Sequence, residues 1–145
     1  MIVDDKIYIS YTAKRENCYF NKIVYAELKL DFLNFVSLFN PNQCIEIQDS
    51  FSKFNAQAAG GRILKKGDNI YLTTGTFLNN DLAQNNNSIF GKVLEINIEN
   101  GNYKIFAKGF RNPQGLTEYK NNLILSEHGP YGGDEINKLI LNQNY

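Results

Sequence analysis

Residues 68–73 read Asp-Asn-Ile-Tyr-Leu-Thr, a polar turn followed by a short apolar run that ends in a hydroxyl. Two other stretches have the same order, Asp5-Lys6-Ile7-Tyr8-Ile9-Ser10 and Asn121-Asn122-Leu123-Ile124-Leu125-Ser126. β-Branched and aromatic residues after a polar turn favour a strand. The three copies predict three equivalent strands, spaced as the four-stranded blades of a β-propeller with loops of variable length would space them.

The segments between the copies carry further strand patterns. The predicted strands are Lys22–Leu30, Val36–Phe39, Cys44–Ile47, Gly61–Leu64, Lys92–Ile98 and Tyr103–Lys108. Asn100-Gly101 lies between the last two and predicts a tight hairpin. No stretch predicts an amphipathic helix of three turns. We therefore predict an all-β chain in which residues 1–145 form one domain, an incomplete β-propeller of about three four-stranded antiparallel blades.

Composition restricts the classes of partner. The chain has 15 basic and 15 acidic residues, so no net charge attracts it to nucleic acid or to an anionic membrane. No apolar run reaches the length of a membrane helix, and the first six residues lack the features of a signal peptide. Cys18 and Cys44 are interpreted as free or partly buried thiols, and the alternative is a single bridge in an oxidising compartment.

Side chains of the kinds that commonly bind ligands are concentrated near the C-terminal end of the sequence. Residues 109–115 read Gly-Phe-Arg-Asn-Pro-Gln-Gly, and residues 126–137 read Ser-Glu-His-Gly-Pro-Tyr-Gly-Gly-Asp-Glu-Ile-Asn. We expect these two loops to converge, so that the Arg111 guanidinium and the main-chain oxygens of Gly129 and Pro130 share one pocket.

These two motifs resemble those of the soluble quinoprotein glucose/sorbosone dehydrogenases. Two upstream segments resemble further motifs of the same family in the same order, namely Gly60-Gly61-Arg62-Ile63, and Ala83-Gln84 together with Ser88–Ile96. The resemblance covers roughly residues 55–145 and implies a fragment of a six-bladed propeller. The alternative is a complete small β-domain that acquired one segment of such a protein.

The resemblance implies a site for pyrroloquinoline quinone and Ca²⁺. Arg111, Asn112 and His128 match positions that face the quinone in the family, and outside that motif His128 would be read as an ordinary loop residue. Gly129 and Pro130 match the pair whose main-chain carbonyls hold the calcium ion, which accepts oxygen ligands readily. For Asp134 and Glu135 the alternatives are calcium binding and a place in a solvated turn. For Arg62 the alternatives are bidentate ligand binding and pairing with a carboxylate of a neighbouring blade.

The family's general base is missing from this sequence. Its histidine falls on Gln57 or Ala58, and neither side chain accepts a proton near neutral pH. The carboxylate that supports this histidine is replaced in the segment ending at Thr76. Base and supporting acid are therefore absent together.

Two functions are compatible with these features. The first is a sugar dehydrogenase, degenerate or truncated, that moves hydride from a carbinol C–H to the quinone. The second is a non-catalytic propeller module that binds a sugar, calcium or a protein partner. The resemblance also implies a periplasmic or secreted location, and another polypeptide as a candidate source of the remaining blades.

Overall fold

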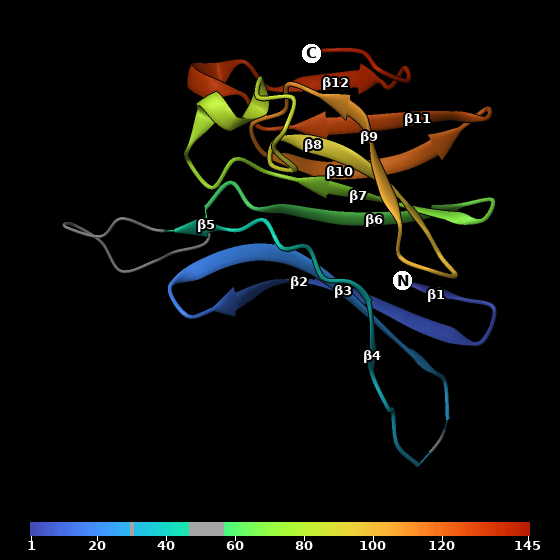
Figure 1. The fold of residues 1–145 in the computed structure, drawn as a ribbon. Helices are drawn as coiled ribbons and strands as arrows, with labels where there is room; N and C mark the ends of the chain where they lie inside the picture. The colour runs from blue at the N-terminus through green and yellow to red at the C-terminus, as the bar shows by residue number, and fades with distance from the viewer. Residues whose placement is uncertain (30, 47–56) are drawn as a thin grey trace.

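Three antiparallel β-sheets follow one another along the chain in the computed structural model, which describes residues 1–29, 31–46 and 57–145. The sheets are stacked in chain order, from the first sheet in blue to the third in orange and red (Figure 1). The two 3₁₀ turns, η1 (Asn80–Ala83) and η2 (Pro130–Gly132), lie at the same end of this stack. The described residues include no α-helix, which confirms the all-β prediction.

The sheets are built from consecutive strands. The first contains β1 (Ile2–Val3), β2 (Lys6–Arg15), β3 (Cys18–Glu27) and β4 (Val36–Phe39), and β5 (Ile45–Glu46) also pairs with β3. The second contains β6 (Gly60–Lys66), β7 (Asn69–Thr74), β8 (Lys92–Asn97) and β9 (Tyr103–Lys108). The third has three strands in the described residues rather than the four predicted: β10 (Pro113–Tyr119), β11 (Asn122–Glu127) and β12 (Glu135–Lys138).

The repeated tetrapeptides occupy the second strand of each sheet, namely β2, β7 and β11. In β7, Ile70 and Leu72 belong to the apolar cluster shared with the first sheet, whereas Tyr71 belongs to the cluster shared with the third. This alternation follows from the two-residue period of a strand, which sends successive side chains to opposite faces. The β7 tetrapeptide thus supplies apolar side chains to both interfaces.

The two apolar clusters hold the sheets together. The cluster between the first and second sheets contains Tyr8, Phe20, Ile23, Phe39, Ile70, Leu72, Phe77, Ile89, Phe90, Leu94 and Ile96. The cluster between the second and third contains Tyr71, Val93, Ala107, Phe110, Leu123, Leu125 and Leu139. Burial of apolar surface between the sheets therefore connects the three units. Main-chain hydrogen bonds between β9 and residues 142–145 add a second connection between the second and third sheets.

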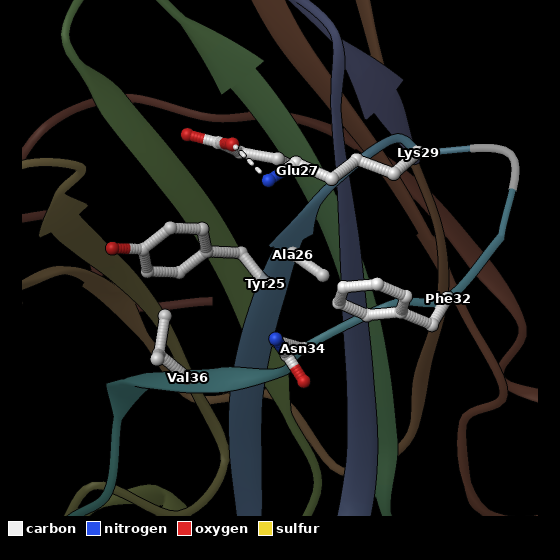
Figure 2. Close-up of a pocket in the computed structure, with 7 residues that line it drawn as sticks. All are labelled: Tyr25, Ala26, Glu27, Lys29, Phe32, Asn34 and Val36. Carbon is white, nitrogen blue, oxygen red and sulfur yellow. Dashed lines mark ion pairs between the residues drawn. The ribbon is translucent and has the colours of Figure 1, made fainter.

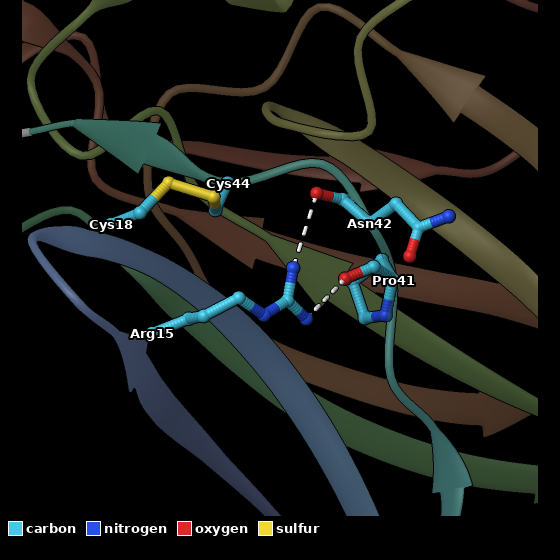
Figure 3. The surroundings of a disulfide bond; sticks show 5 residues. All are labelled: Arg15, Cys18, Pro41, Asn42 and Cys44. Carbon is cyan, nitrogen blue, oxygen red and sulfur yellow. Dashed lines mark hydrogen bonds between the residues drawn. A yellow bond between two sulfur atoms is a disulfide. The ribbon is translucent and has the colours of Figure 1, made fainter.

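Cys18 and Cys44 form a disulfide, with their Cα atoms 5.4 Å apart (Figure 3). The interpretation as free thiols is wrong. Cys18 pairs with Glu46 in the β3–β5 ladder, and this pairing brings Cys44 beside the start of β3. Arg15 supports the same turn by donating to the main-chain oxygens of Pro41, at 3.2 Å, and of Asn42, at 3.4 Å.

Lys92 is a fully buried cation in the second sheet. Its Nζ donates to the main-chain oxygens of Leu82 (2.7 Å), Ala83 (2.9 Å) and Phe90 (2.7 Å), so it anchors η1 and the following loop to β8. Burial, together with the positive charge of Lys108, lowers the pKa of Lys92 from 10.5 to about 8.

The predicted hairpin at Asn100-Gly101 is present between β8 and β9. Gly101 has a positive φ of 72°, a conformation that glycine adopts without strain, and its N–H donates to the oxygen of Asn97 at 3.0 Å. Among the described residues, no helix is long and apolar enough to cross a membrane.

Candidate functional site

Arg111 lies between β9 and β10, where main-chain bonds hold the backbone from three sides. The N–H groups of Gly109 and Phe110 donate to the oxygen of Gly91, at 3.2 and 3.1 Å. The oxygen of Arg111 accepts the N–H of Thr76 at 2.9 Å. Because Phe110 is fully buried beside it, the segment cannot move away from the second sheet without exposing apolar surface.

Glu127 fixes the same segment from the end of β11. Its Oε2 accepts the N–H groups of Arg111, at 2.8 Å, and of Asn112, at 3.3 Å. The main-chain oxygen of Asn112 in turn accepts the N–H of His128 at 3.1 Å. Burial raises the pKa of Glu127, and the two backbone N–H donors oppose part of that rise. These hydrogen bonds join the two loops that were predicted to converge.

The Arg111 side chain extends over the end of β11. Its Nη1 donates to the main-chain oxygens of His128, at 3.4 Å, and Gly129, at 3.3 Å, which are long bonds. Its Nε is buried and has no hydrogen-bond partner among the described residues. A buried donor without an acceptor is costly, so this nitrogen is suited to a ligand oxygen.

The carbonyls predicted to hold calcium each accept one hydrogen bond within the protein. Gly129 O accepts from Arg111 Nη1, and Pro130 O accepts the N–H of Gly133 at 3.1 Å within η2. A carbonyl oxygen has two lone pairs, so one remains on each for another partner. Gly129 also packs closely, since a Cβ there would lie 1.8 Å from the oxygen of Gly133.

Residues 111–112 and 127–130 together are called the rim below. His128 and Asp134 lie at its exposed side. The His128 Nδ1 is 3.5 Å from Asp134 Oδ2, and Asp134 Oδ1 accepts the N–H of Gly129 at 3.2 Å. Asn112 Oδ1 accepts from Gln114 Nε2 at 2.7 Å. No group of three or more His, Cys, Asp or Glu side chains in the described part of the chain could hold a metal ion, so main-chain oxygens would have to contribute.

The segment on which the resemblance places the family's general base, residues 57–58, lies close to this rim. The oxygen of Ala58 accepts the N–H of Phe77 at 3.0 Å, and Thr76 connects directly to Arg111. The Ala58 side chain is buried and its φ is 54°, whereas Gln57 is exposed. Thr76 is fully buried and its Oγ1 donates to Asn80 Oδ1 at 3.0 Å. Main-chain hydrogen bonds therefore connect residues 58–59, 75–77 and 111.

Arg62 connects the second sheet to the third. Its Nε donates to the main-chain oxygen of Gln114 at 2.6 Å, and β6 and β10 run beside each other. Its partner is thus a carbonyl of the neighbouring sheet, and not the carboxylate that was considered. Asn137 Nδ2 donates to Glu135 at 3.0 Å, so Glu135 has a partner on its own strand.

A separate pocket lies at the outer edge of the first sheet (Figure 2). It is lined by Tyr25, Ala26, Glu27, Lys29, Phe32, Asn34 and Val36, and Lys29 Nζ lies 3.5 Å from Glu27 Oε2. Both side chains of this ion pair are largely exposed. The pocket contains none of the predicted site residues and belongs to the loop between β3 and β4.

A protein-family model described as glucose/sorbosone dehydrogenase matches residues 3–145. An aldose sugar dehydrogenase, YliI, of Escherichia coli strain K12 is 34% identical over 102 residues, covering 59% of this chain and 28% of that protein. The apo-form crystal structure of the soluble aldose sugar dehydrogenase from E. coli superposes with a TM-score of 0.77 at 26% identity, over 97% of this chain and 44% of that one.

Two further solved structures share the fold. A glucose dehydrogenase has a TM-score of 0.81 at 22% identity, over 97% of this chain and 45% of its own. The pyrroloquinoline-quinone-bound aldose sugar dehydrogenase from Streptomyces coelicolor has a TM-score of 0.75 at 24% identity, over 98% of this chain and 43% of its own. The chain spans less than half the length of these relatives.

Proposed function

Since this chain belongs to the glucose/sorbosone dehydrogenase family, we propose that it is a pyrroloquinoline-quinone-dependent sugar dehydrogenase by type. In this proposal it retains the cofactor-binding rim and has lost the general base. The observation that carries the proposal is the buried Nε of Arg111, which has no partner among the described residues and lies beside the ends of β10 and β11. The relative with bound quinone supports the choice of cofactor.

The residues of the rim fit a polyanionic quinone. Arg111 supplies a permanent positive charge and a free buried donor, and its backbone is fixed by Glu127 and Thr76. Asn112 and His128 add side chains that can donate hydrogen bonds on either side of it. When bound, the quinone accepts a hydride from the carbinol carbon of a sugar. Arg111 would stabilise negative charge as it develops on the cofactor's oxygens.

Calcium is the metal ion proposed for the turn at Gly129 and Pro130. Each of these carbonyl oxygens retains a lone pair, and calcium accepts main-chain oxygens in a flexible geometry. Asp134 lies on the same turn and is the carboxylate proposed to complete the protein's share of the ligands.

We also propose that the protein works in an exported, oxidising compartment such as the periplasm. The Cys18–Cys44 disulfide supports this location, because such bonds persist mainly outside the cytosol. We propose that the three described sheets form part of a six-bladed propeller, as the resemblance to the family implies. The proposed partners are a small sugar and the cofactor; the balanced charge of the chain supports neither nucleic acid nor an anionic membrane.

The second candidate is a non-catalytic module that binds a sugar, calcium or a protein through the same rim. It is favoured by one observation: Thr76, at the position of the supporting acid, is buried and already donates to Asn80. Neither Gln57 nor Ala58 offers a basic atom.

Restoring the base separates these two functions. Gln57→His is the suitable variant, because position 57 is exposed, whereas Ala58 is buried with a positive φ. Dye reduction would be measured with quinone, Ca²⁺ and glucose for the wild type, for Gln57→His, and for Gln57→Asn as a polar control without a base.

We expect Gln57→His to raise the rate, up to the roughly 10²- to 10⁴-fold that a general base contributes, and Gln57→Asn to leave it unchanged. If Gln57→His stays at the wild-type rate while the quinone binds, the module is the better account. If the quinone does not bind to any variant, the proposed cofactor is wrong.

A further inference from the structure

The loop between β7 and β8, residues 75–91, holds the Arg111 segment at both of its ends. Near its start, the N–H of Thr76 donates to the oxygen of Arg111 at 2.9 Å. At its end, the oxygen of Gly91 accepts the N–H groups of the two residues that precede Arg111, at 3.2 and 3.1 Å. The N–H of Gly91 also donates to the oxygen of Gly75 at 3.2 Å, which joins the two ends of the loop. The position of the Arg111 backbone therefore follows the conformation of this loop.

Lys92, the first residue of β8, holds the loop from inside the protein. Its side chain is fully buried, and its Nζ donates to the main-chain oxygens of Leu82 (2.7 Å), Ala83 (2.9 Å) and Phe90 (2.7 Å). An ammonium group has three N–H donors, so each donor has an acceptor. Two of the acceptors lie in η1, and the third belongs to the residue before Gly91.

The buried charge restricts the loop to one arrangement. A buried ammonium group without acceptors is costly, so conformations that withdraw any of the three oxygens are disfavoured. Hydrogen bonds from a charged donor are also stronger than neutral ones. Thr74 holds the same end of the loop, since its buried Oγ1 accepts the N–H of Lys92 at 3.1 Å and donates to the oxygen of Ile89 at 2.5 Å. Gly91, which lies between these contacts, is thereby fixed against β8.

We propose that Lys92 is a positioning residue for the rim: through the loop and Gly91, it fixes where the Arg111 segment lies. The chain of contacts runs from the Lys92 ammonium to the oxygen of Phe90, then through Gly91 to the segment before Arg111. Every contact in it lies inside the second sheet or between that sheet and the start of β10. The ligand of the rim rests on the proposed function, whereas the placement of the segment does not.

Hydrogen exchange of the Gly109 and Phe110 amides tests this placement without a ligand. Both amides donate to the oxygen of Gly91, so their protection reports how firmly the end of the loop is held. Lys92→Met has a similar length and no donor, and it leaves three carbonyl oxygens without their partner. We expect the protection of both amides to fall on the order of tenfold. Amides of the β2–β3 ladder report the stability of the first sheet and should lose less.

Lys108→Met is the matched control. Lys108 is the ladder partner of Lys92 on β9, and its Nζ donates to Asn86 Oδ1 in the same loop at 2.6 Å. Because this contact is exposed and involves only a side chain of the loop, its loss should change the protection of the two amides by less than about twofold. Unchanged protection in Lys92→Met, or equal losses in the two variants, would overturn the proposal.

Binding of pyrroloquinoline quinone tests whether Lys92 acts through Arg111. In equilibrium dialysis with Ca²⁺, we expect Lys92→Met to bind the quinone roughly three- to tenfold more weakly per folded molecule, and no more weakly than Arg111→Met. Adding Lys92→Met to Arg111→Met should then weaken binding little further, because both changes remove the same contact. An unchanged affinity in Lys92→Met, or full additivity of the two losses, would overturn the proposal. Circular dichroism measures the folded fraction.

A second variant covers the case in which Lys92→Met does not fold. Lys92→Gln keeps two N–H donors without the charge, and it should lower the protection of the Gly109 and Phe110 amides by a smaller factor. No loss of protection in that variant would overturn the proposal. A wild type that does not bind the quinone would disprove the proposed function instead, and the exchange of the two amides would then decide the role of Lys92.

Discussion

Glu127 is the residue that fixes the geometry of the candidate site. One of its oxygens accepts two main-chain N–H groups, so the position of the Arg111 backbone depends on a side chain from the neighbouring strand. The sequence motif that contains Glu127 predicts ligand contacts for His128, Gly129 and Pro130. Nothing in the pattern predicts that the Glu127 carboxylate binds the main chain of residues 111–112. Its function depends on a contact between residues 16 positions apart, which only the fold supplies.

Replacing Glu127 tests this function through stability. Glu127→Ala leaves two N–H groups without their acceptor, so we expect a loss of about 1–3 kcal/mol in the free energy of unfolding. Glu127→Gln keeps an acceptor oxygen in the same place and should lose much less. Urea unfolding at neutral pH measures both variants. Equal losses in the two variants would contradict the assignment.

The stability that Glu127 contributes changes with pH in a definite direction. Because burial raises the pKa of Glu127 above its ordinary 4.5, the unfolded chain releases this proton at a lower pH than the folded protein. The contribution of Glu127 to stability therefore falls as pH rises from 4.5 towards the folded pKa. Glu127→Gln lacks this titration, so its stability relative to the wild type should increase over that interval.

At the scale of the elements, the disulfide closes a loop that carries β4 and much of the first sheet's edge. It joins residues 26 apart, and a loop of this length is expected to contribute about 3–4 kcal/mol through the entropy of the unfolded chain. We expect reductant to lower the urea midpoint of the wild type by a corresponding amount.

The matched control is the double variant Cys18→Ser with Cys44→Ser. It should unfold at the midpoint of the reduced wild type and should not respond to reductant. A wild-type midpoint that is insensitive to reductant would show that the bond contributes nothing to stability, contrary to this account.

The strands that could be predicted from the sequence are those with local signals. The three tetrapeptides, the Asn100-Gly101 turn and the run from Tyr103 to Lys108 all appear where the pattern places them. β10 was missed, because Pro113 and Gly115 were read as part of a loop. Pro113 begins that strand, where the missing N–H costs no ladder bond, and a register shift accommodates the residues that follow.

The features that escaped prediction depend on contacts between distant residues. The Cys18–Cys44 bond requires β5 to pair with β3, and two cysteines in a sequence do not reveal that pairing. Lys92 looked like the first residue of an ordinary strand, yet it is buried with three carbonyl oxygens around it. The convergence of residues 111 and 128–129 was predicted correctly, because both motifs flank strands that are adjacent in the chain.

At the scale of the whole molecule, the candidate site lies where the second and third sheets meet. Thr76 and Gly91 hold the Arg111 segment from the second sheet, while Glu127 and the Gly129 turn hold it from the third. The site therefore depends on the packing of complete sheets against each other.

Binding of pyrroloquinoline quinone to the intact chain tests the central claim most directly. Equilibrium dialysis in the presence of Ca²⁺ would compare the wild type with Arg111→Met. Arg62→Met is the control, because the Arg62 side chain donates to a main-chain oxygen of β10. We predict that the wild type and Arg62→Met bind the quinone, and that Arg111→Met binds at least about tenfold more weakly, as the loss of one charge-assisted hydrogen bond implies. Equal binding by all three chains would contradict the account.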